Sequence, residues 1–321
     1  YYEEIHPFLE KKAKELGYEV TYDRKRTGYI TLEGEDNSKT VCMGAHLDTI
    51  GLIVRHISDE GHLEVRQLGG VNYSSIEGEG VTIHTRDGKK YRGMVICKSH
   101  SVHVFDDART APRDELHMEV ILHEDVNSKA DVMNLGIDHG DVISIDPHFE
   151  YTPSGYVKSR FIDDKAAVAA LFEMIAYFKR NNLKPKYRTL LAFPLYEEIG
   201  HGGAYVPEEV SEYVALDIGL IGPDYHGNET TVSICAKDNY SPYDRGLTNR
   251  IISQAKKANL NYCVDVFYRY GTDANAAIRA GNNVYAAAFG MACINSHGME
   301  RCHISAIEET AKLAIAYALD I

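Results

Sequence analysis

The stretch Thr40-Val41-Cys42-Met43-Gly44-Ala45-His46-Leu47-Asp48 decides the fold of this chain. Its first six residues are small, apolar or β-branched, as in a central strand that is buried on both faces of a parallel sheet. The run ends at His46, and residues at the carboxyl ends of such strands form the binding sites of open α/β sheets. The stretch therefore predicts a buried strand that delivers a functional histidine.

Asp48 supports this interpretation, because in an extended backbone it points to the same face as His46, two positions before it. Its carboxylate can accept one N–H of an imidazole whose other nitrogen binds a metal ion. A core histidine with a local hydrogen bond would show the same pattern.

The rest of the chain alternates between helix-like and strand-like segments. Apolar residues recur at helical spacing in three segments, namely 5–16, 168–178 and 247–255. Short apolar runs predict four further strands, namely 189–193, 213–216, 264–268 and 284–289. Gly17 is placed to end the first helix, and Ser305 with Glu308 forms a capping box that begins a final helix. These segments predict an α/β fold with a mixed sheet.

The pattern changes in the middle of the chain, where short alternating runs are separated by glycines. The runs 81–84 and 91–96 flank an Asp87-Gly88 turn, which is typical of a β-hairpin. We therefore expect a small, barrel-like all-β domain inserted into a discontinuous α/β domain. The expected bounds are 1–70 and 158–321 for the α/β domain and 71–157 for the insertion.

Composition excludes several classes of partner. The 321 residues include 34 Lys and Arg against 47 Asp and Glu, a formal net charge of −13, which disfavours nucleic acid. No run approaches the roughly 18 apolar residues of a membrane span, and no basic, apolar leader precedes the first helix, so we expect a soluble cytoplasmic protein. The six cysteines contain no C-x-x-C pair, which argues against a zinc knot or a disulfide framework and fits a reducing compartment.

Acidic residues recur where the predicted strands end and helices begin. Asp163-Asp164 precedes a helix, whereas Glu197-Glu198 and Asp217 each follow an apolar strand. Taken singly, such residues are ordinary helix caps or solvated surface acids. Together with His46 they form the set that a two-metal hydrolase needs: a bridging carboxylate, ligands on each side and a spare carboxylate to deprotonate the shared water.

Two of these positions allow a choice between neighbours. Asp163 is our choice for the bridging carboxylate, with Asp164 turned away to hold the loop. Either His297 or His303 can supply the last histidine, and we prefer His303 because it lies nearest the start of the final helix. The sequence contains no G-x-S-x-G elbow, which disfavours a serine nucleophile.

Six motifs carry a resemblance to a known family, namely Gly44–Gly51, Leu68–Gly70, Asp163–Lys165, Glu197–Gly200, Ala215–Asp217 and Tyr270–Ala274. In this order they resemble metallopeptidase family forty-two, which contains the TET-type, glutamyl and deblocking aminopeptidases. The match spans nearly the whole chain, including the β-insertion. It implies a zinc-exopeptidase-like catalytic domain with two divalent cations per chain, Zn²⁺ or Co²⁺.

The resemblance also implies a role for each site residue. One cation would be held by His46 and Asp217 and the other by Glu198 and His303, with Asp163 as the bridge, Glu197 as the general base and Asp48 beside them as a catalytic residue. Related enzymes have a cis peptide bond after the bridging aspartate. Thr272 and Asp273, in the family's G-T-D loop, are expected to border the substrate, although they also suit a turn before a helix. Thr49, Lys165 and Gly202 depart from the commoner residues, with Gly202 in place of an arginine.

The implied activity is that of an aminopeptidase, which removes N-terminal residues from peptides with a free amino terminus. The resemblance further implies a homo-oligomer, a dimer or a tetrahedral dodecamer, in which the β-domain makes subunit contacts and controls access. An N-acyl amino acid deacylase on the same scaffold is an alternative. A glycosidase fits less well, since it needs only two carboxylates flanking the sugar bond. A non-catalytic metal-binding protein is a further alternative.

Overall fold

The computed structural model describes residues 2–321, which form two compact units. The first consists of residues up to Asp48, Phe149–Ser296 and Glu300–Ile321, and the second of Thr49–His148 and His297–Met299. The division differs from the expected bounds at residues 70 and 158. The reason is that the strands directly after Asp48 pair inside the second unit rather than with the central strand.

A mixed sheet forms the middle of the first unit. Among the described residues it has nine strands: β1 (Thr21–Tyr22), β2 (Gly28–Leu32), β12 (Tyr187–Phe193), β3 (Asp36–Gly44), β13 (Val210–Leu216), β17 (Tyr285–Cys293), β15 (Val232–Lys237) and β16 (Tyr262–Val266) in spatial order, with β14 (Gly219–Leu220) beside β17. The central strands β12, β3, β13 and β17 are parallel, whereas β2 and β15 run antiparallel to them. The predicted mixed sheet is confirmed, with β3 at its centre.

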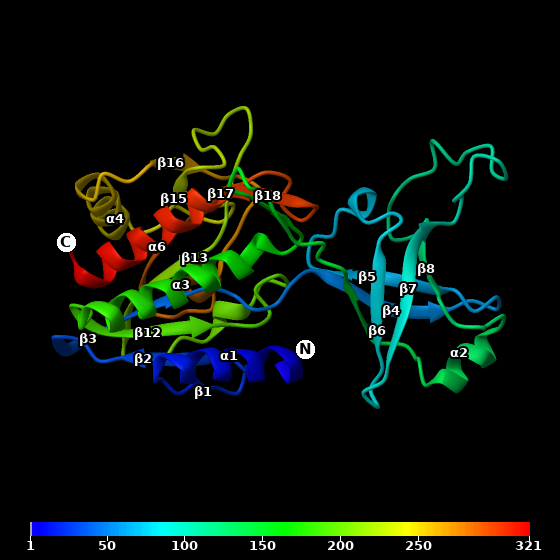
Figure 1. The fold of residues 1–321 in the computed structure, drawn as a ribbon, viewed down its shortest axis with the longest axis horizontal. Coiled ribbons are helices and arrows are strands. Elements are labelled where there is room, and N and C mark those ends of the chain that lie inside the picture. The colour runs from blue at the N-terminus through cyan, green and yellow to red at the C-terminus, as the bar shows by residue number, and fades with distance from the viewer. Residues whose placement is uncertain (1) are drawn as a thin grey trace. The chain divides into compact units, whose positions relative to one another are not determined.

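Helices cover both faces of this sheet. One face packs against α1 (Tyr2–Leu16), α3 (Ile162–Asn181), α4 (Arg245–Lys257) and α6 (Ile304–Leu319), which Figure 1 shows along the sheet, and the other against α5 (Asp273–Arg279). Successive residues of β3 therefore enter different cores: Met43 belongs to the same core as Leu171 of α3, whereas Cys42 belongs to the same core as Ala274 of α5. Burial on both faces explains why the central strands are continuous apolar runs.

The helix ends agree with the sequence in one case and differ in another. Gly17 follows α1 with a φ of 88°, which a glycine adopts without strain. The capping box predicted at Ser305 is wrong, because α6 begins at Ile304 and His303 is its N-cap. The imidazole of His303 accepts the Ser305 N–H, so Ser305 lies inside the first turn. Of the predicted strands, the one at 264–268 ends earlier, as β16 stops at Val266.

Short elements complete the first unit. A three-stranded sheet contains β10 (Glu150–Tyr151), β11 (Tyr156–Ser159) and β18 (Glu300–His303), and a 3₁₀ helix, η2, spans Gly202–Ala204. All six cysteines of the chain are buried free thiols. No helix in the part of the chain that the structure describes combines the length and the hydropathy needed to cross a bilayer.

The second unit is a closed β-barrel. Its strands follow the order β4 (Gly51–Ile57), β5 (Leu63–Leu68), β8 (Met118–Leu122), β7 (Lys90–Cys97), β6 (Gly80–His84) and β9 (Val142–Ile145), with η1 (Tyr73–Ser75) and α2 (Lys129–Leu135) in the connections. The predicted hairpin is confirmed as β6 and β7, and Gly88 in its turn has a φ of 83°. Val81 and Ile83 of β6 are buried, so alternate residues fill the barrel.

Candidate metal centre

The acidic motifs of the sequence meet at one edge of the central sheet. His46 follows β3, Glu197-Glu198 follows β12, Asp217 follows β13, and Asp163-Asp164 lies at the start of α3. Parallel strands end at a common edge, which brings these side chains together. In the described part of the chain, three overlapping groups have potential ligand atoms within 4.8 Å of one another: His46 with Asp163 and Glu198, His46 with Glu197 and Asp217, and Asp163 with Asp164 and Asp217.

His46 lies in the middle of this cluster and is only 2% exposed. Its Nε2 is 3.0 Å from Oδ1 of Asp163 and 3.7 Å from Oε2 of Glu197. Burial alone would lower the pKa of His46, but the carboxylates of Asp163 and Asp48 raise it more strongly, so that it lies well above its usual value. The imidazole therefore faces an excess of negative charge.

The carboxylates themselves show the same excess. Burial raises the pKa of Asp164 and of Asp217 well above the usual range, and neighbouring aspartates raise both further. Burial also raises the pKa of Glu197, again with a contribution from Asp217. Buried carboxylates that repel one another need a cation to be stable in the ionised form.

Asp164 supplies a direct test of whether a cation fits. The peptide bond between Asp163 and Asp164 is cis, as the resemblance implies. Oδ2 of Asp164 accepts the backbone N–H of His46 at 3.0 Å, whereas its buried Oδ1 has no hydrogen-bond partner. An orphaned carboxylate oxygen among imidazole and carboxylate donors suits a divalent cation such as Zn²⁺. The residues present therefore fit a metal site.

Asp48 holds the two glutamates rather than the histidine ring. Its carboxylate oxygens accept the backbone N–H groups of Glu197 and Glu198, each at 3.1 Å. His46 Nδ1 lies 3.0 Å from the backbone oxygen of Asp48 but 3.6 Å from its carboxylate. The predicted carboxylate–imidazole bond is thus replaced by a carbonyl contact. Burial raises the pKa of Asp48, but the nearby His46 imidazole, helped by the hydrogen bonds from the Glu197 and Glu198 backbone, outweighs burial and leaves the pKa below its usual value.

The turn that carries the glutamates is closed by its own backbone. Gly200 donates its N–H to the Glu197 carbonyl at 2.6 Å, and His201 donates to the Tyr196 carbonyl at 3.0 Å. Tyr196 and Gly200 have φ values of 71° and 84°. Asp48, which lies beyond the end of β3, accepts hydrogen bonds from the same turn, so the backbone of both glutamates is held in place.

The G-T-D loop has a structural and an electrostatic role. Thr272 is the N-cap of α5 and its Oγ1 accepts the Ala274 N–H, as the turn alternative predicts. Asp273 is 4% exposed, its Oδ1 accepts the Gly203 N–H at 2.5 Å, and its Oδ2 has no partner. Burial raises the pKa of Asp273 to about 7, and its charge in turn raises the pKa of Glu197.

The glycine at position 202 leaves room for this aspartate. A Cβ atom there would lie 2.5 Å from Oδ2 of Asp273, closer than real Cβ atoms approach. A side chain at position 202 would therefore collide with Asp273.

The structure does not bring His303 into the cluster. Its Nε2 is 3.0 Å from the Ser154 carbonyl oxygen, and its Nδ1 is 2.7 Å from the Ser305 hydroxyl. Side chains alternate along β18, so His303 lies opposite to the buried Glu300 and Cys302. The choice of His303 relied on its closeness in sequence to the final helix, which says nothing about the face of the strand that it occupies.

Glu300, which the sequence analysis did not single out, contacts the backbone of the cluster. It is 1% exposed, and its Oε2 accepts the backbone N–H of Asp163 at 3.0 Å. Its spacing of two from the apolar Cys302 was the available signal, since residues i and i+2 of a strand share a face.

Known proteins match this chain over most of its length. Residues 27–313 fit the sequence profile of the M42 glutamyl aminopeptidases. The chain belongs to the M42 family. YhfE of Bacillus subtilis (strain 168), which is named as an aminopeptidase, is 39% identical over 315 residues, covering 98% of this chain and 91% of that protein. The glutamyl aminopeptidase of Lactococcus lactis subsp. cremoris (strain MG1363) is 24% identical over 204 residues, covering 63% and 56%.

A solved structure shows the same fold. The TET1 peptidase of Pyrococcus horikoshii has a TM-score of 0.86 at 24% identity, covering 100% of this chain and 95% of that one. This M42 protein therefore has the mixed α/β fold of the TET peptidases, and it is an aminopeptidase, a hydrolase of peptide bonds.

Proposed function

We propose that this aminopeptidase uses two divalent cations, Zn²⁺ or Co²⁺, held by the cluster at the carboxyl edge of the sheet. His46 and Asp217 would hold one cation and Glu198 the other, with Asp163 as the bridge. Three overlapping groups that contain these side chains, each with its ligand atoms within 4.8 Å of one another, carry the proposal. His303 is left out of the set because both of its ring nitrogens have partners elsewhere.

Glu197 is the proposed general base. It belongs to the cluster, and a carboxylate beside the attacking water can take its proton and return it to the leaving amine. The cations, when bound, would polarise the scissile carbonyl and lower the pKa of the water. Asp48 would act through the backbone of Glu197 and Glu198, which makes it a positioning residue.

The substrate is proposed to be a peptide with a free amino terminus. Asp273 holds the neighbouring Gly203 through its carboxylate, and its negative charge would attract the ammonium group of such a substrate. Thr272 would position this loop, because Tyr243 and Ala274 already occupy its hydroxyl. A deacylase on the same scaffold would lack a free ammonium group in its substrate, so acetylated and free peptides separate the two activities.

We also propose a homo-oligomer. A relative of this fold, TET1 of Pyrococcus horikoshii, can assemble into a tetrahedron or a large octahedral shell. The barrel unit is the candidate for subunit contacts and for control of access, and analytical ultracentrifugation of the purified protein would test whether it assembles.

The test of the mechanism is Glu197→Gln, assayed on a panel of aminoacyl-anilides beside elemental analysis of bound metal. We expect two metal ions per chain in both proteins and a loss of turnover of at least about 10²-fold in the variant. Glu208→Gln, a surface change, is the matched control and should retain full turnover. Unchanged turnover in Glu197→Gln would refute its role, and a protein without metal after purification and Zn²⁺ or Co²⁺ addition would refute the metal centre.

A further inference from the structure

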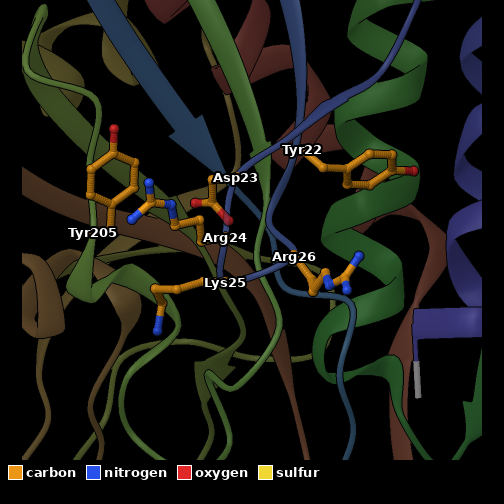
Figure 2. A pocket seen from close by; sticks show the side chains of 6 residues that line it. All are labelled: Tyr22, Asp23, Arg24, Lys25, Arg26 and Tyr205. Carbon is orange, nitrogen blue, oxygen red and sulfur yellow. The ribbon is translucent and has the colours of Figure 1, made fainter.

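A cavity of about 880 Å³ lies beside the first strands of the first unit. It is lined by Tyr22 at the end of β1, by residues 23–26 of the loop before β2, and by Tyr205 just after η2; Figure 2 shows their side chains. The volume is in the range of small-ligand sites. None of these residues belongs to the proposed metal cluster.

The charges on the cavity walls are unbalanced. Arg24, Lys25 and Arg26 are consecutive, and Asp23 is the acidic side chain among them. Asp23 is already engaged within its own loop, because its carboxylate accepts the Thr27 N–H at 2.9 Å and the Tyr29 hydroxyl at 3.2 Å. The cavity thus carries a net positive charge that its own aspartate does not neutralise.

Arg24 is the cation that remains available. Arg26 places its guanidinium 4.5 Å from the centre of the Tyr2 ring, and Lys25 is hydrogen bonded elsewhere. Within residues 2–321, the exposed Arg24 side chain makes no hydrogen bond or ion pair. Tyr205, a residue that is 50% exposed, lines the same cavity and carries a hydroxyl group.

Lys25 connects this cavity to the turn 196–201, which carries Glu197 and Glu198. Its Nζ donates to the His201 carbonyl at 2.6 Å and lies 2.8 Å from His201 Nδ1 and 5.6 Å from the centre of the Tyr196 ring. Tyr196 and His201 enclose the turn that carries Glu197. The charge of Lys25 also lowers the pKa of Asp273, so the cavity lies within electrostatic reach of the proposed site.

We propose that Arg24 and Tyr205 bind a carboxylate of the peptide substrate in this cavity, beside Lys25. The inference rests on the proposed function and extends it to substrate selection. A guanidinium presents paired N–H donors that match a carboxylate, and a phenol adds a third. The carboxylate is either an acidic side chain of the first residue or the carboxyl terminus of a short peptide.

Four peptides separate these sources: Leu-Gly-Gly, Leu-Gly-Gly-amide, Glu-Gly-Gly-amide and Gln-Gly-Gly-amide. Each is assayed with the wild-type enzyme, with Arg24→Gln and with Arg180→Gln as a control. Arg180 is an exposed arginine at the end of α3 and lines no wall of the cavity. Arg24 has no partner to lose, so its replacement leaves the fold intact; circular dichroism and thermal unfolding verify this.

We expect Arg24→Gln to raise KM about tenfold for the peptides whose carboxylate it contacts and to leave kcat unchanged. A rise confined to Leu-Gly-Gly assigns the carboxyl terminus, and a rise confined to Glu-Gly-Gly-amide assigns the side chain. An equal change in KM for all four peptides would overturn the proposal. An unchanged KM for both Leu-Gly-Gly and Glu-Gly-Gly-amide would also overturn it. No turnover of any peptide by the wild-type enzyme would refute the proposed function, and this proposal with it.

Discussion

Replacing Asp48 by asparagine tests whether its carboxylate positions the turn that carries Glu197 and Glu198. The Asp48 carboxylate accepts one N–H from Glu197 and one from Glu198, both at 3.1 Å. An asparagine has a single carbonyl oxygen, so it can accept one of the two and must turn its amide N–H groups toward the other. The variant keeps the shape of the side chain but leaves one backbone donor without an acceptor.

The size of the effect follows from the lost hydrogen bond. A hydrogen bond to a charged group contributes about 1.5–3 kcal/mol. If the loss is expressed in the transition state, because Glu197 is no longer held in place, kcat falls by roughly 10- to 150-fold. KM should change much less, since Asp48 does not touch the substrate in the proposed mechanism.

The assay is steady-state hydrolysis of an aminoacyl-anilide, with thermal unfolding measured on the same samples. Asp131→Asn is the matched control, because Asp131 accepts the Asn127 N–H at 3.1 Å and the Ser128 hydroxyl at 2.7 Å, but in the barrel unit. We expect full turnover from this control. An Asp48→Asn enzyme with unchanged kcat, or with KM alone affected, would show that the carboxylate does not position the base.

Two further changes test the packing around the site. Gly202→Ala should lower the free energy of unfolding by about 1–3 kcal/mol, because its Cβ would meet Oδ2 of Asp273 at 2.5 Å, and combining it with Asp273→Ala should remove that penalty in denaturant titrations. Glu212→Gln should cost about 3 kcal/mol, since the buried Glu212 is bound by Lys39 at 2.5 Å and also by Arg250.

The second change also predicts a pH dependence. Burial raises the pKa of Glu212, but hydrogen bonds from Arg250, Lys39 and Tyr317 outweigh it and lower the pKa below its model-peptide value of 4.5. Because the pKa of Glu212 is lower in the folded protein, its ionised carboxylate stabilises the fold above about pH 4.5. This stabilisation is lost as the pH falls through the pKa of Glu212 in the folded protein. The difference in free energy of unfolding between the wild type and Glu212→Gln should therefore shrink in acid, and a constant difference would contradict the assignment.

For the Gly202 prediction, an equal loss of stability in Gly202→Ala and in the double variant with Asp273→Ala would contradict the steric argument.

The sequence predicted the centre of the site because the strands that build it are unambiguous. A run such as Thr40–Ala45 is apolar on both faces, and the residue that follows it must lie at the sheet edge. His46 and Asp217 could be placed in this way without knowing any contact. The first domain boundary was harder, because the alternating β4 and β5 fit a sheet of either unit.

Side-chain direction in short elements was the part that sequence could not supply. In the four residues of β18, a shift of one position exchanges the faces of Glu300 and His303. The partners of Asp48 are likewise fixed by a turn almost 150 residues later in the chain, which no local pattern reveals.

The register of the three central strands has a consequence for how this protein can change. Gly44 pairs with Ala192 on one side and with Ala215 on the other, so β3, β12 and β13 reach the sheet edge almost level. The number of residues from Ala192 to Glu197, and from Ala215 to Asp217, therefore sets how far each acidic side chain lies beyond the paired strands. Substitutions within the strands can vary, but one inserted or deleted residue would turn Glu197 or Asp217 to the opposite face. The site therefore depends on the spacing along each strand as well as on the identity of the acidic residues.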